Sequence, residues 1–148
     1  MPTTTVDSAF PTPVVYVDEP YASVRWEEGI VIMEWKGFAN SAQFRATQEA
    51  VLLAVYENGA QRLLCDIRHG KVVLVQDERW VVEDMVPRLA RTGLRFTAVV
   101  MPENQLALVI ATDLTNATRP RDGTSVSEQF GSVAEGLIWL RSREMSQR

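Results

Sequence analysis

The run Leu63-Leu64-Cys65, inside the segment LLCDIRHGKVVL, is the feature that most constrains the fold. Side chains alternate between the two faces of a strand, so consecutive apolar residues place apolar groups on both faces. A strand of this kind needs cover from both sides, which a largely parallel sheet with helices on each face provides. The sequence therefore predicts a central strand from Arg62 to Ile67.

Apolar periodicity predicts further strands and helices along the chain. The other expected strands are Val14–Val17, Ala22–Glu27, Ile30–Lys36, Phe96–Met101 and Val126–Phe130. The expected helices span residues 40–58, 77–92, 104–114 and 132–141. Alternating strands and helices favour the α/β class, because parallel strands need crossover connections. We expect a mixed, mostly parallel sheet of four to six strands, covered by about four helices.

Short local signals set several of the expected boundaries. Asn40 with Gln43, and Ser132 with Glu135, have the spacing of capping boxes at helix starts. Asp77 is a plausible N-cap for the second helix. Pro87 lies inside that helix and should kink or interrupt it.

Length and composition indicate one ordinary globular domain. We expect the 148 residues to form a single domain over 14–143, with flexible tails at 1–13 and 144–148. The net charge of -4 argues against nucleic acid and against an anionic membrane surface as partners. No run reaches the roughly 18 apolar residues of a membrane span. The start of the chain lacks the basic and apolar regions of a secretory signal. We therefore expect a cytoplasmic protein, without membrane insertion.

The tripeptide Arg68-His69-Gly70 resembles the loop that carries the catalytic histidine in the histidine phosphatases. That chemistry needs a second histidine in the phosphate pocket, and His69 is the single histidine here. The family also places its motif near the start of the chain, and different residues follow it. A phosphoryl-transfer hydrolase using this loop is thus a disfavoured alternative.

Other catalytic arrangements are incomplete. Strand alternation places Cys65 and Asp66 on opposite faces, so they do not form a nucleophile and its partner. One histidine with scattered carboxylates supports no metal site. Neither GxGxxG nor GxxxxGK[ST] occurs, so the common phosphate-binding loops are missing. We expect no enzyme activity, no cofactor and no metal.

The element order resembles the STAS domain, the fold of anti-anti-sigma factors, and in particular small bacterial stand-alone proteins of this type. The matching motifs are VIMEWKG, LLCDIR ending in Asp66, FTAVVM and AEGLIWL. In the anti-anti-sigma members, a partner kinase phosphorylates a Ser or Thr just after the Asp-ended strand. The stretch from Asp66 to Trp80 contains neither residue, so the resemblance implies a member without that phosphorylation switch.

Polar residues near the end of the central strand form the candidate partner surface: Asp66, Arg68, His69, Asp77 and Trp80. In open α/β sheets, ligands and partners bind beyond the carboxyl ends of the strands. Plainer interpretations are a local Asp66–Arg68 ion pair and core packing of Trp80. The loop containing Arg119 and Arg121 could contact an anionic partner, or simply be solvated.

We therefore expect a non-enzymatic STAS-like regulatory or interaction module with a protein partner. The alternative is a protein that binds a small apolar or anionic molecule. An edge strand near either end of the chain could pair with a second copy to form a homodimer.

Overall fold

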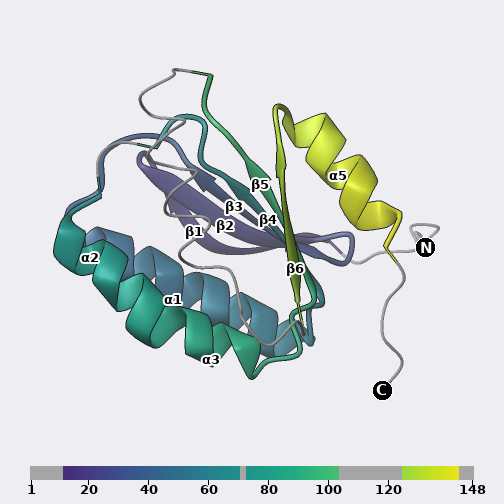
Figure 1. The fold of residues 1–148 in the computed structure, drawn as a ribbon, viewed down its shortest axis with the longest axis horizontal. Helices are drawn as coiled ribbons and strands as arrows, with labels where there is room; N and C mark the ends of the chain where they lie inside the picture. Colours follow the sequence, from purple (N-terminus) through teal and green to yellow (C-terminus); the bar gives the residue numbers. More distant parts are fainter. Residues whose placement is uncertain (1–11, 71–72, 104–124, 144–148) are drawn as a thin grey trace, which may run out of the picture.

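Six strands form one mixed sheet. The computed structural model describes residues 12–70, 73–103 and 125–143. The sheet has the order β1-β2-β3-β4-β5-β6, as Figure 1 shows. Its strands are β1 (Val14–Glu19), β2 (Ala22–Glu27), β3 (Ile30–Trp35), β4 (Arg62–Asp66), β5 (Phe96–Val100) and β6 (Val126–Phe130). Strands β1 to β3 pair antiparallel, and β3 to β6 pair parallel. The predicted mixed, mostly parallel sheet is confirmed.

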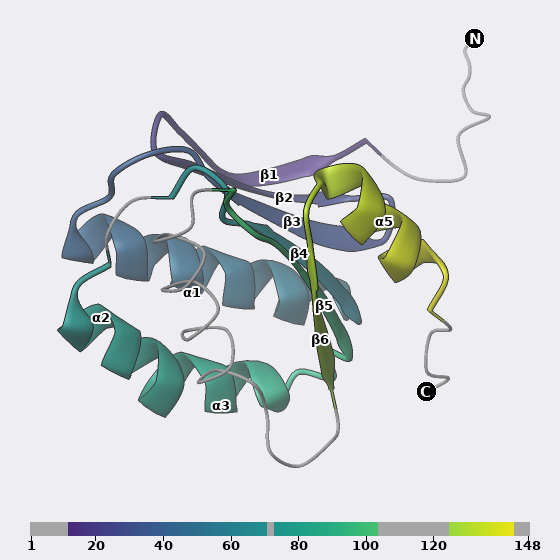
Figure 2. The same cartoon turned by 45° about the horizontal axis from the view of Figure 1, so that its top comes forward.

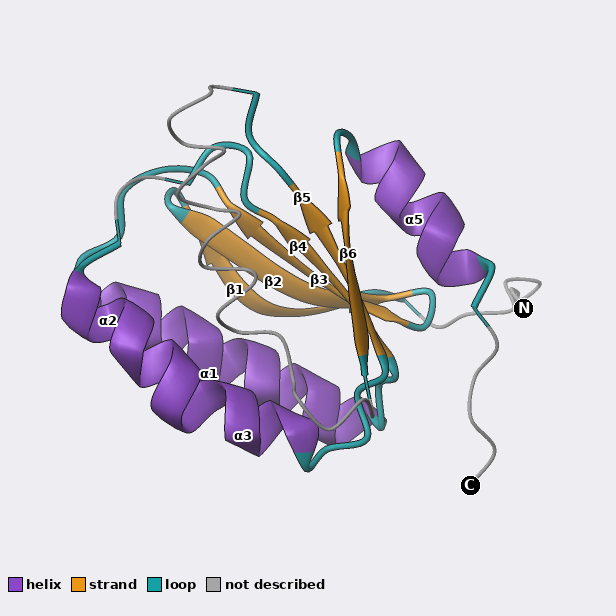
Figure 3. Ribbon diagram, in the orientation of Figure 1, coloured by secondary structure: helices purple, strands orange, loops and turns teal. Residues whose placement is uncertain are grey.

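Three helical segments cover this sheet within the described parts of the chain (Figure 3). They are α1 (Ser41–Asn58), the run formed by α2 (Val75–Trp80), η2 (Val81–Met85) and α3 (Val86–Ala90), and α5 (Val133–Arg141). Helix α1 and the α2–α3 run lie on one face, and α5 lies on the other (Figure 2). That is slightly fewer helices than the four expected. The helix predicted over 104–114 lies outside the described residues.

Strand β4 is buried on both faces, as the apolar run predicts. Leu63 packs in the core beneath α1, together with Met33 of β3 and Val55 of α1. Leu64 is fully buried and packs in the second core, with Ile32 and Leu140 of α5. Because neighbouring residues of β4 serve different cores, this strand joins the two halves of the molecule.

The predicted hairpin and the predicted caps of the first and last helices are confirmed. Glu28 and Gly29 both have positive φ, at 51° and 80°, as the tight two-residue turn between β2 and β3 requires. The side chain of Asn40 accepts a hydrogen bond from the backbone of Gln43, and the Gln43 side chain accepts one in return. Ser132 caps α5 by accepting from the Glu135 backbone N–H. Strand β1 carries a bulge between Val15 and Val17.

The second helical run begins earlier than predicted. Helix α2 starts at Val75 after the N-cap Leu74, so the predicted N-cap role of Asp77 is wrong. The side chain of Asp77 is occupied elsewhere, as described below. Before Pro87 the helix widens into a π-helical turn, in which the Val86 N–H bonds to the Val81 carbonyl. Proline has no N–H for the helical ladder, and the widened turn precedes this missing donor.

Helix α5 packs very close to the sheet at Gly136. A Cβ added there would lie 3.2 Å from Leu64 Cδ1 and 3.4 Å from Ala98 Cβ. Both neighbours are fully buried, so neither has free space to move into. The missing side chain of Gly136 therefore sets the distance between α5 and strands β4 and β5.

A larger residue at this contact should destabilise the protein. We expect Gly136→Val to lower the free energy of unfolding by about 1–3 kcal/mol, because the new methyl groups overpack the core. Urea denaturation measures this loss. The control Ile138→Val changes an exposed residue of the same helix and should alter stability by less than about 0.5 kcal/mol. Equal stability of both variants would contradict the close packing.

Candidate functional site

The carboxyl ends of the parallel strands β3 and β4 lead into two loops, described over residues 36–40 for the first and over residues 67–70 and 73–74 for the second. The first loop enters α1 and the second enters α2 (Figure 1). The starts of the two helices are joined by a hydrogen bond of 2.7 Å from Ser41 Oγ to Asp77 Oδ1. The loops therefore leave the same edge of the sheet and end side by side.

Asp66 and Arg68 form a closed ion pair at the end of β4. Arg68 donates from Nε to Asp66 Oδ1 at 2.9 Å and from Nη2 to Oδ2 at 2.8 Å. The Arg68 backbone N–H also donates to the same carboxylate. These hydrogen bonds raise the pKa of Arg68 above its ordinary value. Asp66 is almost fully buried, so the pair neutralises its charge inside the loop. The local ion pair weighed from the sequence is what the structure contains.

The histidine of the Arg68-His69-Gly70 loop is exposed. Close packing explains why residue 70 is glycine, because an added Cβ would lie 3.3 Å from Trp35 Cβ. Cys65 packs in the core beneath α1, away from the loop. Burial, together with the charge of Asp66, raises the pKa of the Cys65 thiol to about 12. The structure therefore does not bring these residues together as a nucleophile and its base.

Asp77 is buried between α1 and α2. It accepts hydrogen bonds from Ser41 Oγ and, at 2.8 Å, from Arg45 Nε. The Arg45 guanidinium carbon also lies 5.1 Å from the ring centre of Trp80. Burial by itself would raise the pKa of Asp77, but the hydrogen bonds from Ser41 and Arg45 and the Arg45 charge outweigh it, and the pKa is lowered. Asp77 joins two helices and is only 2% exposed, so it presents no charge to a partner.

The five predicted surface residues thus divide into two groups and one isolated side chain. Asp66 and Arg68 form one pair, and Asp77 and Trp80 belong to the junction of α1 and α2. Trp80 is half-buried and packs against the core, in keeping with its plainer interpretation. The Arg119 and Arg121 loop lies outside the described residues.

Sequence reasoning missed the exposed apolar residues just before α1 and at the start of α2. Phe38 is 65% exposed, Leu74 is 49% exposed and Val75 is 67% exposed. We call these three residues the loop patch. A signal was available, because Phe38 lies between the end of a strand and the N-cap Asn40, where no periodicity assigns it to a core. Leu74 and Val75 lie just before Asp77, the expected start of the second helix, so no predicted helix face accounted for them.

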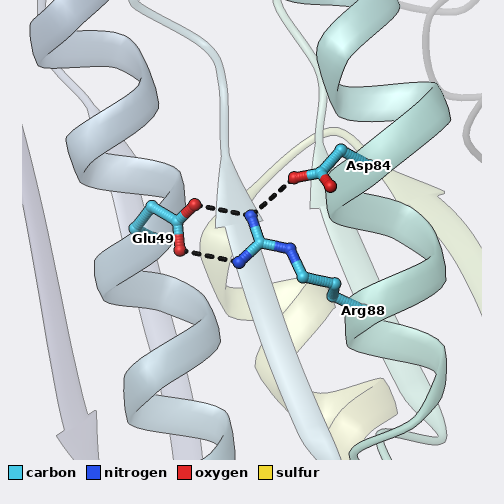
Figure 4. A network of polar contacts seen from close by, with 3 residues as sticks. All are labelled: Glu49, Asp84 and Arg88. Carbon is cyan, nitrogen blue, oxygen red and sulfur yellow. Dashed lines mark hydrogen bonds and ion pairs between the residues drawn. The ribbon is translucent and has the colours of Figure 1, made fainter.

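A surface hollow lies between α1 and α3, on the helix layer. It has a volume of about 390 Å³ and is lined by Glu49, Leu52, Leu53, Tyr56, Arg88, Arg91 and Thr92. Arg88 crosses from α3 to Glu49 on α1 with bonds of 2.9 and 2.5 Å, and also bonds Asp84 at 2.7 Å (Figure 4). The hydrogen bonds from Arg88 to Glu49, and to a smaller extent the one to Asp84, raise the pKa of Arg88 above its ordinary value. Arg88 therefore fastens the two helices together along one side of the hollow.

Comparison with known proteins supports the fold. No family model matches the chain, and no curated protein matches it. The NMR structure of the protein TM1081 is similar, with 12% sequence identity and a TM-score of 0.57. The match covers 97% of this chain and 100% of that one. The likeness supports the α/β fold.

The described residues contain no group of three His, Cys, Asp or Glu side chains that could hold a metal ion. Within the same residues, every helix is too short or too polar to cross a membrane.

Removing the Asp77 charge should weaken the junction of α1 and α2. We expect Asp77→Asn to lower the free energy of unfolding by about 1–2 kcal/mol at pH 7, since a hydrogen bond to a charged group is lost. Because the folded pKa is lowered, the wild-type advantage is complete above the unfolded pKa of about 3.9 and falls as pH drops below it. Chemical denaturation between pH 7 and pH 3 measures this. Glu78→Gln is the matched control, and a pH-independent difference would contradict the charged junction.

Cys65 should react slowly with thiol reagents. Its pKa of about 12 leaves little thiolate at pH 7.5, and its side chain is only partly exposed. We expect alkylation by iodoacetamide at least about a hundredfold slower than for an unperturbed thiol. The control carries Ile138→Cys with Cys65→Ala, because residue 138 is 67% exposed. Mass spectrometry reads the rates, and equal rates would show that Cys65 is accessible.

Proposed function

We propose that this protein is a non-enzymatic STAS-like interaction module of the bacterial cytoplasm, which binds a protein partner through the loop patch. The observation that carries the proposal is the exposure of Phe38, just before α1, and of Leu74 and Val75, at the start of α2, where the Ser41–Asp77 hydrogen bond joins the two helix starts. Apolar side chains exposed together, with polar residues around them, are typical of protein contact sites. Their place beyond the carboxyl ends of parallel strands is where α/β proteins bind partners.

The surroundings of the patch favour a protein over a small ligand. Its side chains lie before α1 and at the start of α2, and each is about half or more exposed. Nearby charges are largely neutralised internally, by the Asp66–Arg68 and Asp77–Arg45 ion pairs. A partner covering this edge would bury apolar surface with little cost from desolvating free charges. Exposed His69 and the half-exposed Arg68 would then lie at the polar rim.

The resemblance to STAS domains also bears on regulation. The stretch from Asp66 to Trp80 has no hydroxyl to phosphorylate. The Ser41 hydroxyl, at the start of the adjacent helix, donates a hydrogen bond to Asp77. We therefore propose that binding is controlled by the partner's own state or abundance, without phosphorylation of the segment from Asp66 to Trp80.

Affinity capture from lysate of the source organism tests this proposal. The wild-type bait stands beside a bait with Phe38→Ser and Val75→Ser, and a control bait with Ile138→Ser, which changes an equally exposed apolar residue on α5. We expect a defined partner bound by wild type and control, and reduced at least tenfold with the double variant. Identical capture by all three baits would refute the role of the loop patch.

A follow-up measurement separates the interaction module from an enzyme. The captured partner and the purified protein are mixed, and their affinity is measured by calorimetry with His69→Ala as a further variant. We expect binding with at most a small loss for His69→Ala. A phosphorylated His69 after incubation with phosphoryl donors would instead favour the phosphoryl-transfer alternative.

The hollow between α1 and α3 supports a second candidate function, binding of a small molecule that has an apolar body and an anionic group. Leu52, Leu53 and Tyr56 provide apolar surface, and Arg91 provides an exposed guanidinium beside it. Native mass spectrometry of the protein purified under gentle conditions tests this function. A co-purified molecule lost on Leu53→Asp would support it, and a mass equal to the bare chain would argue against it.

A further inference from the structure

The outer edge of strand β1 has the properties of a pairing surface. Strands β1 and β6 are the two ends of the sheet. Strand β1 reads VVYVDE, and its β-branched and aromatic residues strongly favour extended structure. Val14 and Val15 are 45% and 59% exposed. The outer backbone groups of such a strand can accept another strand.

The turns of the meander determine which backbone groups of β1 point outward. The two-residue turn at Glu28-Gly29 is closed by the pair Glu27 and Ile30, which direct their backbone groups toward each other. Alternation along β2 then directs Val24 and Trp26 toward β1. Their partners in β1 are Val17 and Val14, whose backbone N–H and C=O groups therefore point toward β2.

The bulge in β1 changes the phase of the outward groups. Val15 is opposite Arg25, and Asp18 is opposite Ser23. The backbone N–H and C=O groups of Val15 and Asp18 therefore point away from β2. With the extra residue Tyr16 between them, these two outward positions are three residues apart. Both lie on the sheet face that carries α5, because Arg25 and Ser23 alternate with the residues buried beneath α1.

We propose that β1 pairs antiparallel with β1 of a second copy of this chain, with Val15 of each copy opposite Asp18 of the other. This register matches outward backbone groups with outward backbone groups. It also matches side chains of the α5 face with each other, and places Tyr16 opposite Val17 on the helix face. The two symmetric bulges lie opposite each other, so neither strand has to shift. The result is a closed two-fold dimer with one continuous sheet.

The distribution of charge along β1 favours pairing with a second copy of the chain. In the proposed register the acidic residues Asp18 and Glu19 face valines and do not face each other. Asp18 of one copy lies in line with Val15 and then Arg25 of the other, on the same face. Arg25 is about one-third exposed and could approach that carboxylate.

The helix layer leaves room for the second copy. Helix α1 contacts β1, β2 and β3, and its end is fixed near β1 by a 2.7 Å hydrogen bond from Tyr16 to Glu57. Two β2 strands across the paired edge would be three strand spacings apart, about 14 Å. Helices pack at about 8–10 Å, so two α1 helices fit side by side without collision.

The other edge is less suited to this pairing. Between its terminal residues, β6 carries Ser127, Glu128 and Gln129, which have weaker strand preference than the valines of β1. Pairing β1 of one copy with β6 of the next would leave one edge of each open and would propagate into a filament. A closed dimer through β1 avoids this.

Sedimentation of the full-length chain tests the dimer. We expect a species of twice the 16.6 kDa chain mass at micromolar concentrations. Val15→Asp places like charges opposite Asp18 at both symmetric sites and should raise the dimer Kd about tenfold at low salt. Val15→Lys places opposite charges there and should leave the Kd unchanged or lower it. Residue 15 is exposed, so both variants should fold, which circular dichroism confirms.

Disulfide trapping tests the register independently. In a Cys65→Ala background, Val15→Cys with Asp18→Cys should form covalent dimers on mild oxidation, whereas each single cysteine should form few. A wild-type monomer up to about 100 μM, well above the micromolar Kd of ordinary weak association, would overturn the proposal. Equal effects of Asp and Lys at position 15, or equal trapping by single and paired cysteines, would also overturn it.

Discussion

Burial of β4 on both faces is the constraint on which the rest of the structure depends. Leu63 and Leu64 are adjacent in sequence, yet one packs under α1 and the other under α5. Neither helix layer can be removed without exposing half of this strand. The parallel pairing of β4 with β3 and β5 follows, because helical connections supply that cover. Two loops consequently leave the same edge of the sheet, where the loop patch lies.

The position of those loops depends on a second interaction, the buried carboxylate of Asp77. Its bonds to Ser41 and Arg45 join the starts of two helices that are far apart in sequence. Midway along α1, Glu49 accepts hydrogen bonds from Arg88 of α3. Two polar contacts therefore hold the helices parallel to each other, at their start and along their length. The loop patch rests on this frame and so is presented in one arrangement.

The elements of the fold were largely predictable because their signals are local. The capping pair Asn40 and Gln43, the turn at Glu28-Gly29 and the apolar run of β4 each depend on a few neighbouring residues. The candidate site was less predictable, because contacts between distant segments decide it. Asp77 has the residue type of an N-cap, but Arg45, thirty-two positions earlier, determines its role. Exposure of Phe38 likewise depends on how its loop leaves the sheet, which no short pattern records.

The arrangement of strands also has a consequence for how the chain folds. Strands β1, β2 and β3 are joined by two-residue turns, so their pairing closes only short loops. Pairing β3 with β4 requires the whole of α1 to be spanned first, and β5 joins only after the second helical run, α2 to α3. Short loops close with little loss of chain entropy and form early. The antiparallel strands β1 to β3 would thus form first and serve as a template for the parallel strands β4 to β6. Strand β3 belongs to both parts, so it is the strand on which the slower parallel pairing begins.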